Sequence, residues 1–421
     1  MEPLKLINSK KEWFYLISFL IFIFSFNLFK EYQYFQSITK DEYFKTSGKI
    51  INIYPKKEKQ HTLNIAKIET DFGHFFTTIP ISNQLKKHDH IEFIVVTQKL
   101  DFIDFIKGGF LKTFSVEKID SNKNLIAKYY DYISSQHDNS ALGSLFNTLF
   151  FATSLDKNIQ NICSVYGISH IVAISGFHLG IISLVLYFLF NLLYTPIHQK
   201  YFPYRNKKFD ILISTSIILF LYLLIINLVP SFLRAFLMFI FGILLLRSNI
   251  KLISFGSLAI IVALIIAFLP KLIFLISLWF SVAGVFYIFL YLQYFSNLNK
   301  YFSFIFFNFW IFFTINPITH YFFGTTSIVQ FLSPLITLGF SVFYPVELLL
   351  HIINLGGLFD FLLLKWINLE VSHYEIFIPI GFVLYYLLIS FGAIFFRYSF
   401  YLLNTSALIA NIYIYSLVFY Y

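Results

Sequence analysis

The chain has almost no cysteine and little charge. Cys163 is the only cysteine among 421 residues, which excludes a disulfide within the chain and any metal site built from several thiolates. Charged residues make up 13% of the chain, against about 25% in a typical soluble domain. Catalytic signatures are also missing, because the sequence has no Walker A loop, no GxSxG elbow and no HxHxDH metal motif. Nothing in the sequence therefore predicts an enzyme, a metal or a cofactor.

Apolar and aromatic residues dominate what is present. Hydrophobic residues make up 58% of the chain, the mean hydropathy is +0.72, and there are 57 Phe and 29 Tyr. A membrane-spanning helix needs about 20 apolar residues, so this composition predicts a multi-pass membrane protein. The net charge of +9 fits cytoplasmic loops rich in Lys and Arg. It also fits an anionic partner such as nucleic acid or lipid headgroups.

The first 140 residues divide into an anchor and a polar domain. The apolar run Trp13–Phe29 follows Lys5, Lys10 and Lys11 and has no cleavage site after it. Residues 1–30 are therefore predicted to form an uncleaved anchor with a cytoplasmic N-terminus. Residues 30–140 hold 16 Lys and 14 acidic residues, so residues 31–140 are predicted to form a domain on the extracytoplasmic side.

Short alternating runs rich in β-branched and aromatic residues predict five strands in this domain. These strands are Phe44–Tyr54, Thr62–Thr70, His74–Ile79, His90–Thr97 and Phe110–Ile119. Turn signals lie between them at Pro55-Lys56-Lys57, Asp71-Phe72-Gly73 and Gly108-Gly109. Five such strands predict a small closed β-barrel, of which the OB-fold is the commonest kind.

Residues 141–421 are almost continuously apolar and predict a polytopic helical domain, which gives about 10–11 spans with the anchor. The predicted spans are 168–194, 211–229, 230–247, 250–269, 272–295, 301–316, 318–344, 345–366, 375–396 and 399–421. Alternate loops between them are basic and are predicted to be cytoplasmic; they carry Lys200, Arg205, Lys207, Lys208, Arg247, Lys251, Lys300 and Arg397. Lys271 and Lys365 are exceptions, each a single charge on the other side.

Two segments do not fit simple spans. The stretch 318–344 is predicted to be either a re-entrant element or a kinked helix, because it is interrupted by Pro and Gly at Pro317, Gly324, Pro334, Gly339 and Pro345. The segment Leu142–Leu155 has apolar residues at helical spacing but is too short to cross. It is predicted to lie in the membrane interface.

The segment Gly167–Gly180, GISHIVAISGFHLG, places two His and two Ser at the head of a predicted helix. At 100° per residue one face carries small residues that favour close packing of a second helix; these are Ser169, Ala173, Gly176 and Gly180. Ser175 and His178 lie on roughly the opposite face, with His170 between the two. Two interpretations remain open. Either His and Ser satisfy one another in a tight helix pair, or Ser175 and His178 line a water-filled path.

Polar residues also lie inside other apolar spans. Arg234 is one turn into the span that opens at Pro230, and it either lies beside a path for phosphates or reaches to the interface. Glu347 and His351 are four residues apart, so they either pair at a helix interface or relay protons. Further polar residues within the spans are Asn316, Gln330, Asn354 and Asp360.

Three segments resemble motifs of the ComEC family, the inner-membrane DNA channels of natural transformation. Gly167–Gly180 is similar to the hallmark of that family, which runs roughly GLxHLLAISGLHVG. Pro230–Met238 is similar to PSxxRAxxM, and Leu278–Gly284 to LSFxxxxG. The resemblance implies a channel motif comprising His170, Ser175, Gly176, His178 and Gly180. It implies second and third motifs with Pro230, Ala235, Met238, Ser281 and Gly284.

The layout of the chain also resembles that family. Its members are described as an anchor, an extracytoplasmic OB-like domain and a polytopic competence domain, here residues 1–30, 31–140 and 141–421. The resemblance covers Trp13 to about Pro345. Two departures stand out, because many members carry a C-terminal metallo-β-lactamase-like domain that this sequence lacks, and the loop disulfide of some relatives is impossible with Cys163 alone.

The resemblance implies a channel that carries one strand of transforming DNA across the bacterial inner membrane, with Arg234 as a candidate phosphate contact. Aromatic residues of the barrel would stack on bases, with Tyr43, Phe75, Phe76 and Phe93 as candidates. The implied partners are single-stranded DNA, membrane lipids, a periplasmic DNA receptor, a separate nuclease, a cytosolic motor and a second copy of the chain. Two alternatives remain open, a small-molecule transporter and a membrane glycosyl or lipid transferase. The sequence shows neither the inverted repeat typical of the first nor the charged late external loop that the second needs.

Overall fold

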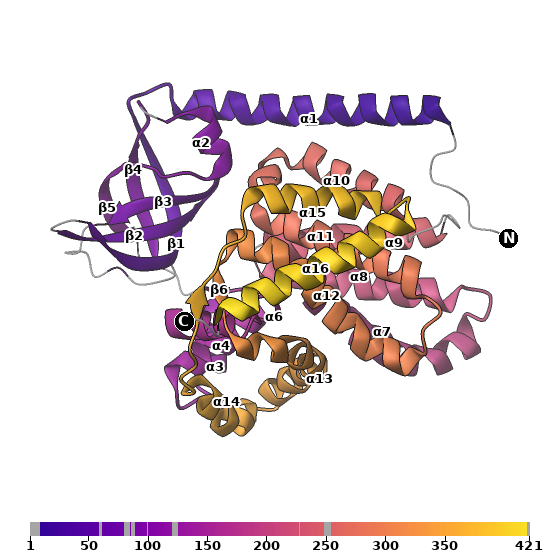
Figure 1. The fold of residues 1–421 in the computed structure, drawn as a ribbon. Helices are drawn as coiled ribbons and strands as arrows, with labels where there is room; N and C mark the ends of the chain where they lie inside the picture. The colour runs from indigo at the N-terminus through magenta and orange to yellow at the C-terminus, as the bar shows by residue number, and fades with distance from the viewer. Residues whose placement is uncertain are drawn as a thin grey trace. The chain divides into compact units, whose positions relative to one another are not determined.

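The computed structural model describes residues 9–58, 61–79, 85, 89–98, 100–119, 125–226, 228–247 and 254–418. Contacts within the chain divide it into two units. The sheet unit contains the described residues from 9 to 129 together with 262–276, and the helical unit contains those from 130 to 261 together with 277–418. Figure 1 shows the strands of the first unit and the helices of the second.

The sheet unit begins with the long helix α1, Lys10–Ile38. Ser9 caps its first turn, because the Ser9 hydroxyl oxygen accepts a hydrogen bond from the Glu12 N–H at 3.2 Å. The first part of α1 leaves its apolar side chains exposed, as in Phe22, which is 69% exposed. Its last part packs on the sheet, where Phe35 and Ile38 join the core. This is the pattern of a membrane anchor that continues into a folded domain.

Five strands follow α1 and confirm the strand pattern predicted from the sequence. They are β1 Tyr43–Glu58, β2 His61–Thr70, β3 Gly73–Ile79, β4 His90–Val96 and β5 Thr113–Ile119. The sheet order is β3-β2-β1-β4-β5, and each neighbouring pair is antiparallel. Alternate residues of β3 and β4 are buried. Phe75 and Phe93 are each 1% exposed and belong to this core, so neither offers a surface for stacking bases.

The predicted turn at Pro55-Lys56-Lys57 is wrong, because β1 runs through it to Glu58. The first half of β1 pairs with β4 as far as Lys49, whereas the second half pairs only with β2, with Pro55 opposite Asn64. A strand segment with a neighbour on one side can accept proline, which has no N–H to donate to the other side.

The two edges of the sheet, β3 and β5, do not form a ladder with each other. They approach at one parallel bridge between Phe76 and Phe110, just before β5. There the Phe76 N–H donates to the Gly109 carbonyl at 3.2 Å, and the Leu111 N–H donates to the Phe76 carbonyl at 2.7 Å. The structure therefore shows an open five-stranded sheet and not the closed barrel that was predicted.

A short helix that is distant in the sequence completes the sheet unit. The helix α2, Phe102–Lys107, precedes β5, and the 3-10 helix η1, Pro270–Phe274, packs beside α1 and α2. Lys271 forms an ion pair with Glu31 at 2.8 Å and donates to the Phe72 carbonyl at 3.0 Å. Lys271, an exception in the charge pattern, thus fastens this loop to the sheet unit.

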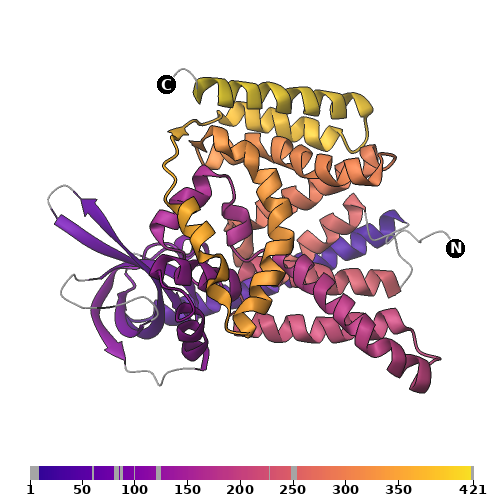
Figure 2. The ribbon, with the colours of Figure 1, turned by 90° about the horizontal axis from the view of Figure 1, so that it is seen from below.

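Four short helices follow β5, α3 Leu125–Ser134, α4 Ser140–Phe151, α5 Lys157–Val165 and α6 Ser169–Val172, and the helical unit begins within α3. Longer helices follow, namely α7 Gly176–Tyr201, α8 Lys207–Ile225, α9 Pro230–Arg247, α10 Phe255–Phe268, α11 Ile276–Phe295 and α12 Lys300–Phe322. The last part contains α13 Ser333–Ile352, α14 Asp360–Ile367, α15 Ile380–Gly392 and α16 Arg397–Val418. The helices α15 and α16 lie side by side in Figure 1 and in Figure 2.

Seven helical segments of the described chain are long and apolar enough to cross a membrane. They are Lys10–Ile38, Gly176–Tyr201, Lys207–Ile225, Ile276–Phe295, Lys300–Phe322, Ile328–Ile352 and Arg397–Val418. Four shorter apolar helices accompany them, at Ser140–Phe151, Ser231–Leu244, Phe255–Phe268 and Ile380–Gly392. The chain is therefore a multi-pass membrane protein, as the composition predicted.

The helix α4 does not present its apolar face to a membrane surface, as the sequence had predicted for 142–155. Its apolar residues are buried in a core shared with α5, α6, α13 and α14. Leu142 and Phe146 are both fully buried there. Other protein segments thus satisfy the amphipathic pattern that indicated an interfacial helix.

The stretch predicted as two spans, 318–344 and 345–366, folds differently. The helix α12 ends at Phe322, and β6, Thr325–Thr326, follows it. The chain then forms the 3-10 helix η2 Ile328–Leu332, α13, the 3-10 helix η3 Gly356–Phe359 and α14. It returns to β6 in β7, Tyr374–Glu375, where Thr325 pairs with Glu375 and Thr326 with Tyr374. The segment between the two strands therefore begins and ends at the same place.

Candidate functional site

The segment Gly167–Gly180 is not one continuous helix. The four-residue helix α6 ends at Val172, Ala173 is extended, and α7 begins only at Gly176. Ser175 is the N-cap of α7, and a capping box forms because the His178 side chain accepts from the Ser175 N–H at 3.3 Å. The prediction of one continuous helix with two faces across 169–180 is therefore wrong, because the chain breaks between α6 and the capped start of α7.

The break reverses the expected exposure of the two faces. His178 is fully buried, and its ring lies 4.8 Å from the Tyr344 ring and 5.5 Å from the Phe340 ring. Ser175 is half-buried, as part of the cap. The four small residues of the predicted packing face are exposed instead, and so is His170; the four are Ser169, Ala173, Gly176 and Gly180. Ser175 and His178 thus belong to the cap of α7, with His178 Nδ1 in the cap and His178 Nε2 buried without a hydrogen-bond partner among the described residues.

A left-handed glycine fixes the entry to this segment. Gly167 has φ +68°, which an L side chain rarely adopts. Its carbonyl accepts a hydrogen bond from the Ser333 hydroxyl at 3.0 Å, at the start of α13. The motif therefore begins at a contact with the helix that also covers His178.

The second motif packs directly against the first. The Ser231 hydroxyl at the start of α9 donates to the Ile174 carbonyl, in the break between α6 and α7. A Cβ added at Gly176 would lie 3.3 Å from the Ala235 Cβ. The predicted close approach of a second helix is thus present at Gly176, and α9 makes it. At Gly180 it is absent, because an added Cβ would meet nothing within 4 Å.

Arg234 joins the second motif to the third. It is 3% exposed, and its guanidinium donates to the Ser277 carbonyl at 2.8 Å and to the Ser277 hydroxyl at 3.3 Å. Ser277 immediately precedes the third motif, in which Ser281 and Gly284 are half-buried. Among the described residues, no carboxylate forms an ion pair with Arg234. The three motifs therefore lie together, although Gly167 and Gly284 are more than 100 residues apart in the sequence. Ser231 joins the second motif to the first, and Arg234 joins it to Ser277, directly before the third.

The remaining motif residues are placed by α9. Pro230 opens this helix, although its side chain lies outside the described part, and Met238 is half-buried two turns later. Phe232 and Phe236 of the same helix share a core with Ile174, Leu179 and α8. The apolar positions of the second motif thus hold α9 against α7 and α8.

Residues 151–378 match a family model described as Competence protein, and this match covers more than half of the chain. The chain belongs to the competence-protein family. All three motifs lie within the matched competence domain. No curated protein and no solved structure matches the chain. Membership of this family connects the chain with DNA uptake.

Polar residues inside the apolar helices of the competence domain form a connected network. The Asn316 amide donates to Asn411 Oδ1 at 2.7 Å and to the Tyr415 hydroxyl at 3.3 Å. The Tyr415 hydroxyl donates to Gln330 Oε1 at 3.1 Å, and Gln330 Nε2 donates to the Ser164 carbonyl at 3.3 Å. The network ties α12 and α16 to the end of α5, directly before the first motif, and gives these buried groups a structural role.

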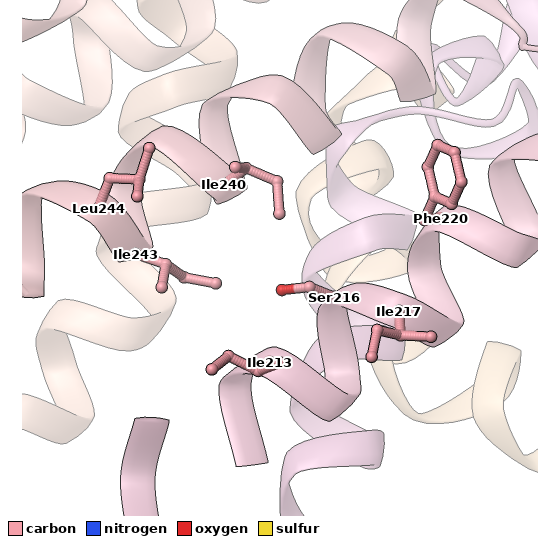
Figure 3. A pocket seen from close by; sticks show the side chains of 7 residues that line it. All are labelled: Ile213, Ser216, Ile217, Phe220, Ile240, Ile243 and Leu244. Atoms are coloured by element: carbon pink, nitrogen blue, oxygen red, sulfur yellow. The ribbon is translucent and has the colours of Figure 1, made fainter. Parts of the chain in front are cut away.

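An apolar groove lies between α8 and α9. Figure 3 shows its lining side chains, of which Ser216 is the only polar one among the seven labelled. The groove has a volume of about 340 Å³. The Ser216 hydroxyl already donates to the Leu212 carbonyl at 2.7 Å. No polar group is left there to bind a nucleic acid, and lipid tails suit such a surface.

Sequence reasoning missed the partners of Glu347 and His351. His137, between α3 and α4, contacts His351 and Asp360. These residues lie more than 200 positions apart, so no local spacing links them. Among the described residues, no group of three or more His, Cys, Asp or Glu could hold a metal ion.

Proposed function

We propose that this competence protein is a channel that passes one strand of transforming DNA across the bacterial inner membrane into the cytoplasm. A polyanion crosses hydrocarbon only along a wet, protein-lined path. The observation that supports this function best is Arg234, a buried cation without a carboxylate partner in the described chain, at the point where the three motifs meet.

A buried arginine is costly when no anion accompanies it. Arg234 donates to one carbonyl and one hydroxyl, and its buried Nε has no partner in the described part of the chain. A phosphate would complete this set, because the guanidinium fork matches two phosphate oxygens. The present arrangement leaves Arg234 only 3% exposed. Contact with DNA therefore requires α9 and the start of α11 to separate, and we propose that they do so during passage.

The fold also supports an orientation. Within the sheet unit, η1 contacts α1 and α2, so the loop after α10 lies on the same side of a membrane as the sheet. Four helices, α7 to α10, lie along the chain between the sheet and this loop. Four crossings return the chain to the side of the membrane on which it started, which agrees with the contact of η1. The loops on the opposite side contain Lys200, Arg205, Lys207, Lys208, Lys300 and Arg397. By the positive-inside rule that side is the cytoplasm, and the sheet is periplasmic.

We further propose that the sheet receives DNA on the periplasmic side. Tyr43 is 59% exposed and Phe114 is 64% exposed, and each offers a ring for base stacking. We assign no catalytic step to the chain, so degradation of the second strand falls to a separate nuclease. A periplasmic receptor, a cytosolic motor, membrane lipids and a second copy of the chain complete the proposed set of partners.

The first test follows DNA in a strain that lacks the gene. Fluorescent duplex DNA is supplied, and DNA protected from nuclease in the periplasm is scored separately from DNA in the cytoplasm. We expect periplasmic duplex without cytoplasmic entry, restored by the intact gene. Normal cytoplasmic entry in the deletion strain would refute the channel.

The second test is the substitution Arg234→Gln in the same assay. Glutamine keeps a donor for the Ser277 carbonyl but removes the charge. A charge-assisted hydrogen bond contributes about 1.5–3 kcal/mol, so we expect cytoplasmic entry to fall by about tenfold or more at unchanged protein abundance. The matched control is Arg397→Gln, which removes an exposed arginine at the start of α16. Equal entry for both variants would contradict a role of Arg234 in passage.

A further inference from the structure

Four titratable side chains from three separate segments form a buried chain in the helical unit. Both carboxylate oxygens of Asp360, at the start of α14, lie near His137 Nδ1, at 2.8 and 3.1 Å. His137 Nε2 lies 3.0 Å from His351 Nε2. His351 Nδ1 lies 2.8 Å from the Glu347 carbonyl, one turn earlier in α13. The side chains of His137, His351 and Glu347 are at most 2% exposed.

Both outer nitrogens of the two rings face groups that accept hydrogen bonds. His137 Nδ1 faces the Asp360 carboxylate, and His351 Nδ1 faces a backbone carbonyl, which cannot donate. With Asp360 ionised, each Nδ1 bears a hydrogen. A neutral imidazole bears only one, so two neutral rings would place two bare Nε2 lone pairs 3.0 Å apart. One additional proton between the rings removes this conflict.

The surroundings decide which ring is the cation. Glu347 is 1% exposed, and neither of its carboxylate oxygens has a hydrogen-bond partner among the residues that the structure describes. An ionised carboxylate that is buried needs a neighbouring positive charge, and Glu347 Oε2 lies 3.4 Å from His351 Nδ1. Burial lowers the pKa of His137, an effect that its hydrogen bond to Asp360 only partly offsets. The Phe146 and Phe150 rings cover His351, with ring centroids 4.6 and 5.0 Å away.

We propose that the described chain contains a proton-binding site at His351, which is doubly protonated, donates through Nε2 to His137 and pairs with Glu347. The titratable groups facing it are His137, Glu347, Asp360 through His137, and Tyr132, whose hydroxyl donates to the His351 carbonyl at 3.1 Å. If this proton is lost, one nitrogen of His351 becomes a bare acceptor. It then faces another acceptor, either the Glu347 carbonyl or His137 Nε2. The hydrogen bond between the His351 and His137 rings therefore forms only while the site holds its proton. This inference does not depend on the proposed DNA channel.

Solid-state NMR tests this assignment on the full chain in lipid bilayers, with histidine rings labelled with ¹⁵N. At pH 8 an exposed histidine is mostly neutral, so we expect the imidazolium signal of one of the eleven histidines to persist. His351→Gln removes this signal. Glu347→Gln keeps both rings but removes the carboxylate beside His351, and we expect it to weaken the imidazolium signal at pH 8. Asp360→Asn keeps an acceptor for His137 Nδ1 and retains the signal.

The matched control is His320→Gln. His320 is also buried, and its Nδ1 faces the Asn316 carbonyl one turn earlier, at 3.1 Å. Its Nε2, however, faces the Thr326 hydroxyl at 3.0 Å, and that hydroxyl can donate either to this nitrogen or to the Gly324 carbonyl at 2.9 Å. A neutral His320 is satisfied when this hydroxyl donates to Nε2, whereas His351 has no such donor beside it, so we expect His320→Gln to leave the signal in place. Three results would overturn the proposal: no imidazolium at pH 8, a signal that survives His351→Gln, or one zinc ion per chain in purified protein. If His351→Gln does not fold, Glu347→Gln decides.

Discussion

Gly356 lies where a side chain has no room. A Cβ added there would come within 2.6 Å of His351 Nε2 and 2.7 Å of Gln136 Oε1. Both of these atoms already have partners, since His351 Nε2 meets His137 and Gln136 Oε1 accepts from the Gly356 N–H at 2.9 Å. A methyl group must therefore displace one buried polar contact or the other.

We expect Gly356→Ala to destabilise the purified protein. Overpacking a filled interior costs about 1–3 kcal/mol, and the loss of one buried contact adds to this. Thermal unfolding in detergent, followed by intrinsic fluorescence, measures the effect. Gly381→Ala is the control, because an added Cβ meets nothing within 4 Å there and alanine favours the helix α15. An unfolding temperature of Gly356→Ala at or above that of the control would contradict this packing.

The residues of the candidate site could be read from the sequence, but their surroundings could not. Arg234 and His178 stand out as polar groups in apolar segments. Their burial depends on Ser277, Phe340 and Tyr344, which come from helices 40 to 170 residues away. Short-range periodicity contains no information about such contacts. The same holds for His137, whose role follows only from its distances to His351 and Asp360.

At the scale of elements, helix capping explains why a continuous helix was predicted and two helices are present. The apolar spacing across 168–194 is compatible with either. Ser175 and His178 stand three residues apart and satisfy two orphan N–H groups at the start of α7. These local hydrogen bonds favour a new helix start over continuation, and they direct His178 inward against α13.

We expect Ser175→Ala to lower stability by about 0.5–2 kcal/mol, which is the usual cost of removing an N-cap side chain. The control lies in the same helix, because the Ser183 hydroxyl donates only to the Gly180 carbonyl within α7. Ser183→Ala should leave the unfolding temperature nearly unchanged. Equal losses for the two variants would show that the Ser175 hydroxyl does not act as a cap.

The strands were predictable because inward and outward side chains alternate every two residues. This pattern is complete within the seven to sixteen residues of a single strand. Closure of the sheet was not, because it depends on how far β3 and β5 twist toward each other. The backbone bridge Phe76–Phe110 and the hydrogen bond between the Thr77 and Thr113 hydroxyls join these edges without forming a ladder. Periodicity determines which side chains face inward, whereas curvature depends on contacts distant in the sequence.

At the scale of the whole chain, β6 and β7 determine the path of the segment between them. Their pairing returns the chain after α14 to the place where α12 ended. The helix α14 has 8 residues and is too short to cross. We therefore expect that α13 does not cross the membrane and that the loop after it lies on the proposed periplasmic side. The hydrogen bond of His351 to His137, which precedes α7, agrees with this placement.

Labelling of engineered cysteines by a membrane-impermeant maleimide on intact cells, with the outer membrane permeabilised, tests this path. Leu355→Cys places a thiol in the exposed loop after α13, and Tyr204→Cys places one in the exposed loop between α7 and α8. The wild-type chain serves as the blank, because Cys163 is fully buried and burial raises the pKa of its thiol to about 12. We expect Leu355→Cys to react from outside and Tyr204→Cys to react only after the inner membrane is opened. If both cysteines react only after opening, α13 crosses the membrane and the chain does not return on the periplasmic side, whatever the β6–β7 pairing indicates.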